Sequence, residues 1–217
     1  MKTAFRSIGL VVGDARIPDI TLEPGACGGW HVRDADFALE VLDGITGLQP
    51  VQGGESSWFG QELSGLPESG ILRLLSRTMT LTADGPLIAN LNVRDNVLLP
   101  ALHRRTDSEA GLLDKLELLL TGPDLPWPAP ANFPLLLPHH LEALQRWLAG
   151  LLRAALAVPE IVLCCHYPGD LSMREQAELI RGFHWLRGRL PGAAWLFLSC
   201  EPVLPGGFSG SLAEVSP

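Results

Sequence analysis

Cysteine and histidine side chains at the ends of two apolar segments are the groups in this sequence best suited to chemistry. Cys164, Cys165 and His166 end one segment, and Cys200 ends another. Thiolates and imidazoles bind zinc and other transition metals, and a thiolate is also a nucleophile. However, successive side chains of a strand point to opposite faces, and Cys is among the residue types most often buried. We therefore predict buried, reduced thiols and no metal here.

The pair His139–His140 is a second candidate for metal binding. It follows residues 121–138, which hold six prolines and predict an irregular connector. No third ligand is evident beside the pair, so we expect solvated histidines. The connector leads into a helix predicted over residues 141–157.

The apolar segments themselves predict an α/β protein. Residues 160–165 and 193–199 are continuous apolar runs of the parallel-strand type, and residues 172–190 between them predict a helix. Strand–helix–strand alternation of this kind is typical of α/β folds with right-handed crossovers. Near the start, residues 5–22 alternate as in an antiparallel hairpin, and a short strand follows at residues 27–31.

Polar residues predict where the other helices begin. Asp34 precedes apolar residues at helical spacing, and Gly47 is placed to end that helix. Asn92 or Asn90 is expected to cap a second helix, and Ser108 a third.

Composition limits the classes of function. The 217-residue chain has a net charge of −8, which argues against nucleic acid or an anionic lipid surface as the main partner. No apolar run reaches the roughly 18–20 residues that span a bilayer, and the N-terminal segment does not resemble a signal peptide. The four cysteines lack the spacing of a disulfide framework, as is usual for a cytoplasmic protein.

Several short stretches, in this order and spacing, resemble the ATPase domain of ATP-binding cassette (ABC) transporters. TLEPG at residues 21–25 resembles the approach to that family's phosphate loop, and GLQPVQGG at 47–54 the turn after the next helix. NLNVRDNVLLP at 90–100 is similar to the segment after the glutamine loop, and LRAALAVPEIVL at 152–163 to the helix leading into the Walker B strand. The wording NVRDNV is most similar to ATPases of bacterial lipid transporters of the outer-membrane lipid-asymmetry (MCE-associated) type.

The resemblance covers about residues 5–203 and implies a P-loop NTPase-like α/β fold. This fold has a parallel core sheet, an N-terminal antiparallel β part and a helical subdomain. We expect one domain over residues 1–217, with the α/β core formed by 1–82 and 152–217 and the helical subdomain by 83–151.

The phosphate loop of the family is replaced in this chain. The positions of Gly-x-x-Gly-x-Gly-Lys-Ser fall on Val32, Arg33, Asp34, Ala35, Asp36, Phe37, Ala38 and Leu39. Ala38 therefore stands in place of the lysine, and Leu39 in place of the hydroxyl that holds magnesium.

The remaining nucleotide-handling positions are also replaced. The signature Leu-Ser-Gly-Gly-Gln corresponds to Leu141, Glu142, Ala143, Leu144 and Gln145. The Walker B aspartate and catalytic glutamate fall on Cys165 and His166, and the switch histidine on Cys200. The glutamine of the glutamine loop falls on Ala83, and the D-loop aspartate on Ser172. We therefore expect no catalytic, cofactor-binding or metal-binding residue.

These replacements predict weak binding of ATP. A phosphate loop uses glycines so that backbone N–H groups and a helix N-terminus face the phosphates. Losing three charge-assisted hydrogen bonds at roughly 1.5–3 kcal/mol each forfeits about 4.5–9 kcal/mol, enough to weaken micromolar binding past millimolar. We expect Trp30 and Phe37 to fill the space that ATP would occupy.

The main hypothesis is a catalytically inactive ABC-ATPase homologue that binds no cofactor and acts as a structural or regulatory subunit, with a lipid-type transporter as the candidate system. Its expected partners are a transporter membrane subunit, an ABC ATPase subunit or a second copy of itself, at the cytoplasmic face of the plasma membrane. Exposed members of one apolar group are expected to form an interaction patch: Leu87, Ile88, Val97, Leu98 and Leu99.

Two alternatives remain open at this stage. The first is a divergent ABC ATPase that still binds or hydrolyses ATP with Mg²⁺. The second is an unrelated α/β protein with a small ligand at the strand ends, where that fold class usually binds ligands.

Overall fold

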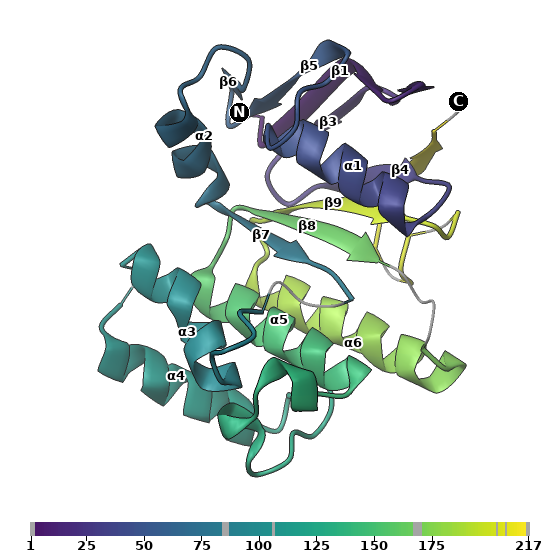
Figure 1. Ribbon diagram of the computed structural model, residues 1–217. Helices are drawn as coiled ribbons and strands as arrows, with labels where there is room; N and C mark the ends of the chain where they lie inside the picture. Colours follow the sequence, from purple (N-terminus) through teal and green to yellow (C-terminus); the bar gives the residue numbers. More distant parts are fainter. Residues whose placement is uncertain are drawn as a thin grey trace. The chain divides into compact units, whose positions relative to one another are not determined.

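The computed structural model describes residues 3–83, 87–105, 107–166, 171–202, 204–206 and 208–215. The chain divides into two compact units (Figure 1). The first comprises Met1–Thr80, Glu160–Tyr167 and Gly192–Pro217, and the second Leu81–Pro159 and Pro168–Pro191.

One of the two sheets in the first unit is antiparallel. Its strands are β1 (Phe5–Val12), β2 (Ala15–Arg16), β3 (Ile20–Leu22), β5 (Gly53–Trp58) and β6 (Gln61–Glu62). Their order is β2-β1-β5-β6, and β3 also pairs with β1. The alternation in the first part of the sequence therefore does form antiparallel pairs, as predicted.

The other sheet of this unit is the core sheet. Its strands are β4 (Cys27–His31), β7 (Thr78–Leu81), β8 (Ile161–His166), β9 (Ala194–Ser199) and β10 (Leu212–Glu214), in the order β10-β4-β9-β8-β7. The pairs β10–β4, β4–β9 and β9–β8 are all parallel. A parallel core sheet with an N-terminal antiparallel part confirms the predicted fold class.

Helix α1 (Ala35–Thr46) joins the interiors of the two sheets, because it contacts β1 on one side and β8 and β9 on the other (Figure 1). Phe37, Val41 and Ile45 on its inner face are buried. The indole N–H of Trp58 donates to the carbonyl of Ile45 at 2.7 Å, which fixes the helix against β5. The unit also contains the short helix α2 (Glu68–Leu75).

Two glycines of this unit are required by geometry. Gly47 ends α1 with φ = 74°, in the left-handed region that glycine adopts without strain. At Gly29, in the middle of β4, a Cβ atom would lie 1.9 Å from the carbonyl oxygen of Phe197 on β9. Only glycine permits this approach of the two strands.

The second unit is helical. It contains α3 (Val93–His103), α4 (Glu109–Thr121), α5 (Ala143–Ala157) and α6 (Met173–Arg189), with two 3-10 turns, η1 (Phe133–Leu135) and η2 (Pro138–His140). Helix α5 packs against α3, α4 and α6. The predicted caps Asn92 and Ser108 accept N–H groups at the starts of α3 and α4, and Ser172 does so at the start of α6.

Asn96 on α3 ties the preceding loop to the helix. Its side chain is 1% exposed, and its Oδ1 accepts the N–H of Ile88 at 2.7 Å. Its Nδ2 donates to the carbonyl oxygens of Ile88, Leu91 and Asn92 at 2.9–3.1 Å. The second asparagine of the NVRDNV stretch thus provides hydrogen-bond partners for backbone groups of a loop outside regular secondary structure.

We predict that Asn96→Ala destabilises the protein by about 2–4 kcal/mol, because it leaves buried backbone groups unpaired. The change is measured by chemical denaturation. Asn90→Ala, at an exposed position of the same loop, is the control and is expected to change stability by less than about 0.5 kcal/mol. Equal effects of the two substitutions would contradict the role of the Asn96 amide.

Candidate functional site

The carboxyl ends of the parallel strands bring three of the six segments that the resemblance matches to nucleotide-handling motifs to one edge of the core sheet. In the register of β4, β9 and β8, His31 pairs with Ser199, and Ser199 pairs with His166. The N–H of Val32 continues the pairing by donating to the carbonyl of Ser199 at 2.8 Å. The positions that match the phosphate loop, Walker B and the switch residue therefore begin at this edge.

The segment that matches the phosphate loop is mostly helical. β4 ends at His31 and α1 begins at Ala35, so only three residues link them. Five of the eight matching positions, residues 35–39, lie in the helix itself. Phe37 and Ala38 are buried, whereas Leu39 is exposed. The backbone here does not form the open curl that surrounds a phosphate.

A carboxylate of the chain itself occupies the N-terminus of α1. Asp34 is the N-cap residue, and its Oδ1 accepts the N–H of Phe37 at 2.8 Å. The Arg33 side chain lies beside it, with Nε 3.4 Å from Asp34 Oδ2 and Nη1 3.7 Å from Asp14 Oδ1. The guanidinium carbon of Arg33 is also 4.2 Å from the centre of the Phe37 ring. The one cation of this segment is thus shared between two carboxylates and a ring.

We predict that Asp34→Ala destabilises the protein by about 1 kcal/mol, because the N–H of Phe37 loses its acceptor. Asp34→Asn is the matched control, since asparagine caps a helix about as well as aspartate does. Denaturant melts of both variants test the cap. An equal loss in both would assign the effect to charge rather than to the hydrogen bond.

Trp30 and Phe37 are both part of the buried core of the first unit. The indole N–H of Trp30 donates to the carbonyl of Pro18 at 2.8 Å, and its ring meets Phe5 edge-on at 6.2 Å. Both side chains are therefore core residues, and only Phe37 lies in the first turn of α1.

The cysteines at this edge are protected thiols. Burial raises the pKa of Cys165 to about 12, with smaller contributions from Cys200 and Asp43. Burial likewise raises the pKa of the Cys164 thiol well above its usual value. Cys200 is half-buried, and its pKa is raised by burial and by the nearby Asp34. None of these thiols has the lowered pKa of a nucleophile or a metal ligand.

We predict that iodoacetamide at pH 8 leaves Cys164 and Cys165 unmodified in the native protein. With a pKa of about 12 for Cys165, the thiolate fraction at pH 8 is on the order of one in ten thousand. Peptide mass spectrometry reads the modification, and denatured protein, in which all thiols react, is the control. Rapid native labelling of Cys165 would contradict the proposed protection.

The positions that match the signature lie at the start of α5, in the second unit. Glu142 is the N-cap residue, and its N–H donates to Oε1 of Gln145 at 3.0 Å. Leu141 is buried just before the helix. Ala143 is the first helical residue, and Leu144 follows it.

The positions that match the glutamine loop, the D-loop and the catalytic glutamate lie at or next to three separate elements. Ala83 is half-buried after β7, and Ser172 is the N-cap of α6, where its hydroxyl lies 2.6 Å from Oε2 of Glu175. His166 ends β8.

Among the residues that the structure describes, no group of three or more His, Cys, Asp or Glu side chains could hold a metal ion. His139 and His140 are exposed.

The apolar residues predicted to form an interaction patch differ in their exposure to solvent. Val97 and Leu98 are buried within the second unit, so packing explains them. Ile88 is 41% exposed and Leu99 37% exposed, whereas Leu87 is half-buried. Two exposed residues thus remain as patch candidates.

Sequence reasoning missed two features. Asp14 was not expected beside Arg33, and only the turn between β1 and β2 brings it there. A groove between α4 and the proline-rich connector was not expected either. The spacing of Leu113, Leu116 and Leu120 along α4 was the available signal.

No protein-family model matches this sequence, and neither does any curated protein. Among solved structures, CbiO1 of Clostridium perfringens, part of the ABC transporter complex CbiONQ, is similar over all of this chain and 88% of its own, with 11% identity and a TM-score of 0.74. The dimeric bacterial ABC transporter cassette MJ0796 covers 89% of this chain and 87% of its own, with 14% identity and a TM-score of 0.68. MJ0796 bound to ADP and Pi gives 15% identity, the same coverage and a TM-score of 0.65.

These likenesses go against an α/β fold unrelated to the cassettes. In the part of the chain that the structure describes, no helix is long and apolar enough to cross a bilayer. Two sheets around α1, a helical unit and the match along the whole chain lead to one conclusion. This chain has the fold of an ABC transporter ATP-binding cassette.

Proposed function

We propose that this chain is a pseudo-ATPase: a cassette-fold protein that does not use ATP and acts as a structural or regulatory subunit through contacts with other proteins. The observation that carries the proposal is the start of α1. The helix begins within the segment that matches the phosphate loop, and Asp34 accepts the N–H of Phe37. An N–H group of the helix terminus that could face a phosphate is therefore already bonded to an internal carboxylate.

Electrostatics at the same edge of the sheet supports this proposal. Asp14, Asp34 and Asp36 are exposed carboxylates, and Arg33 is already engaged with two of them. A triphosphate would have to displace Arg33 or approach these carboxylates directly. Lysine at the Ala38 position is the family's means of offsetting that charge, and Ala38 is fully buried here.

The start of α5 supports the proposal for composite sites as well. In the family, the signature helix of one domain contacts the ATP that is bound to a partner domain. Here its N-terminus carries Glu142, and Gln145 bonds back to the Glu142 N–H instead of facing outward. A carboxylate at this place would repel the phosphates of a partner's nucleotide. Pairing with this chain would therefore leave no complete ATP site.

The assemblies in which the similar structures occur support the choice of partner. CbiO1 is part of a transporter complex, and MJ0796 was solved as a dimer. We therefore propose a transporter membrane subunit, an ABC ATPase or a second copy of this chain as the partner, at the cytoplasmic face of the membrane. Ile88 and Leu99 are exposed apolar residues for such a contact. The NVRDNV stretch makes a bacterial lipid transporter the candidate system.

Thermal unfolding with 5 mM ATP and Mg²⁺ tests the proposal. A protein that binds at about one-thousandth of the ligand concentration gains about 4 kcal/mol, or roughly 8–16 °C in Tm for a domain of this size. We predict a rise of no more than about 3 °C for this chain, because the lost phosphate contacts weaken binding past millimolar.

MJ0796, measured under the same conditions, is the positive control. A larger rise that saturates with nucleotide, and that requires Mg²⁺, would overturn the proposal in favour of a divergent ATP-binding cassette. Affinity purification from the native cell then asks whether a permease or an intact ABC ATPase accompanies the chain.

A further inference from the structure

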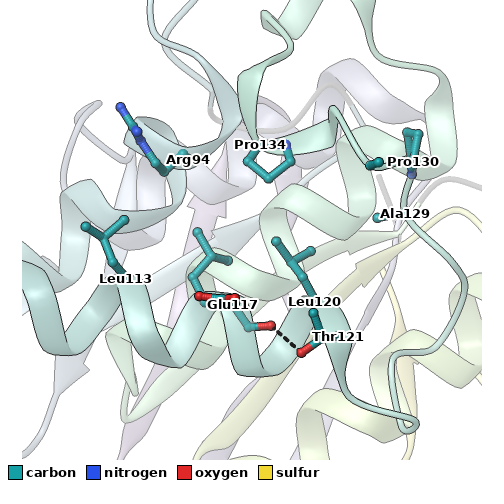
Figure 2. Close-up of a pocket in the computed structure, with 10 residues that line it drawn as sticks. Arg94, Leu113, Glu117, Leu120, Thr121, Ala129, Pro130 and Pro134 are labelled. Carbon is teal, nitrogen blue, oxygen red and sulfur yellow. Dashed lines mark hydrogen bonds between the residues drawn. The ribbon is translucent and has the colours of Figure 1, made fainter.

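A groove in the second unit is lined by one face of α4 and by the proline-rich connector. Its volume is about 360 Å³. Leu113, Glu117 and Leu120 of α4 line one side, and Pro130 and Pro134 face them across the opening (Figure 2). The remaining lining residues are Arg94, Leu116, Thr121, Ala129 and Ala131.

The connector wall of this groove is held at both ends. Trp127 is buried, and its ring packs where a Cβ atom on Gly182 of α6 would lie 2.7 Å from it. Phe133 is fully buried, and its N–H donates to the carbonyl of Pro130 at 2.8 Å. The carbonyl of Leu136 then accepts the N–H of Val93 at 2.9 Å. The groove is therefore formed in the free chain, which lowers the entropic cost of binding.

The lining favours apolar contact rather than strand pairing. Proline has no N–H to donate, so the wall at Pro130 and Pro134 cannot add a strand to a partner. Leucine side chains form the opposite side and the floor. Leu135, the residue after Pro134, is 68% exposed. Exposed apolar surface therefore adjoins the Pro134 wall, which suits a polypeptide segment better than a small molecule.

The charges at the rim favour a cation. Arg94 Nε lies 3.0 Å from Asp95 Oδ1, so this guanidinium already has a carboxylate partner. The Glu117 carboxylate has no ion-pair partner among the residues that the structure describes, whereas Lys115 on the same helix is paired with Asp107 at 2.8 Å. Because Arg94 is paired with Asp95, Glu117 is left as the unpaired charge among the lining residues that the structure describes.

We propose that this groove binds a short peptide segment of a partner protein, in which a large apolar residue fills the cavity and a Lys or Arg one helical turn away pairs with Glu117. The inference deepens the proposed function, on which it rests, by giving the chemistry of a partner segment. It uses only residues of α3, α4 and the connector, so it is tested independently of nucleotide binding.

The probe is a 12-residue helical peptide with leucine and lysine on one face, compared with a peptide that has glutamate in place of lysine. Binding to the full chain is measured by fluorescence polarisation, and the site by methyl NMR of leucine-labelled protein. We expect the lysine peptide to shift the Leu113 and Leu120 methyl signals and to bind at least tenfold more tightly than the glutamate peptide.

Three variants separate groove binding from general attraction to an acidic protein. Ala131→Trp places an indole at the groove and is expected to weaken binding at least tenfold. Glu117→Gln is expected to weaken it about three- to fivefold, the range of an exposed ion pair. Asp114→Asn is the matched control, because it makes the same charge change on α4 outside the lining, and it is expected to leave binding unchanged.

Equal weakening by Glu117→Gln and Asp114→Asn, without methyl shifts in the groove, would overturn the proposal. Saturable displacement of the peptide by octyl glucoside at submicellar concentration, with a tighter Kd than the peptide's, would also overturn it and identify a site for a small amphiphile. If MgATP binds but the peptide results hold, the proposed pseudo-ATPase fails and the groove stands. If neither ligand binds, the groove alone fails.

Discussion

The hydrogen bond from the Phe37 N–H to the Asp34 carboxylate sets where α1 begins, and the interior of the first unit depends on the position of that helix. It fixes the first turn of α1 only three residues after β4. From that start, helical spacing turns Phe37, Val41 and Ile45 toward the two sheets. An open loop at this place would have exposed backbone N–H groups to a ligand. Here the same helix dipole stabilises a side chain of the protein instead.

The two units use the same physical solution at several helix starts. Asp34, Asn92, Ser108 and Ser172 each accept a backbone N–H at the beginning of a helix. Such caps are local, so they are independent of any ligand or partner. A chain that satisfies its helix termini internally needs no ligand to pair those backbone groups. What it presents to other molecules is then apolar surface and charge, as at Ile88, Leu99 and the groove beside α4.

Much of this architecture could be predicted from the sequence, because its signals are local. Caps, the terminating Gly47 and the uniformly apolar strands depend on a few adjacent residues, and they placed α1, α3, β4, β8 and β9 closely. The groove could not be predicted, because it depends on how the Pro130–Pro134 wall packs against leucines that periodicity assigns to the core. The contact of Arg33 with Asp14 likewise depends on a turn far away in the chain. The replacement of the nucleotide-handling residues is a hypothesis that rests on matching positions to a family, and the helical geometry of residues 35–39 agrees with it.

The burial of Ala38 has a consequence for evolution. The side chain at this position is fully buried in the first unit, so a lysine introduced by one mutation would place an ammonium group among apolar atoms, at a cost on the order of several kcal/mol. It would gain no phosphate in return, because the Asp34 cap and the Phe37 ring would still occupy the helix start. A phosphate site at the start of α1 would require several simultaneous changes to these residues. A single substitution at this position therefore opens no stepwise route to a phosphate site in this arrangement.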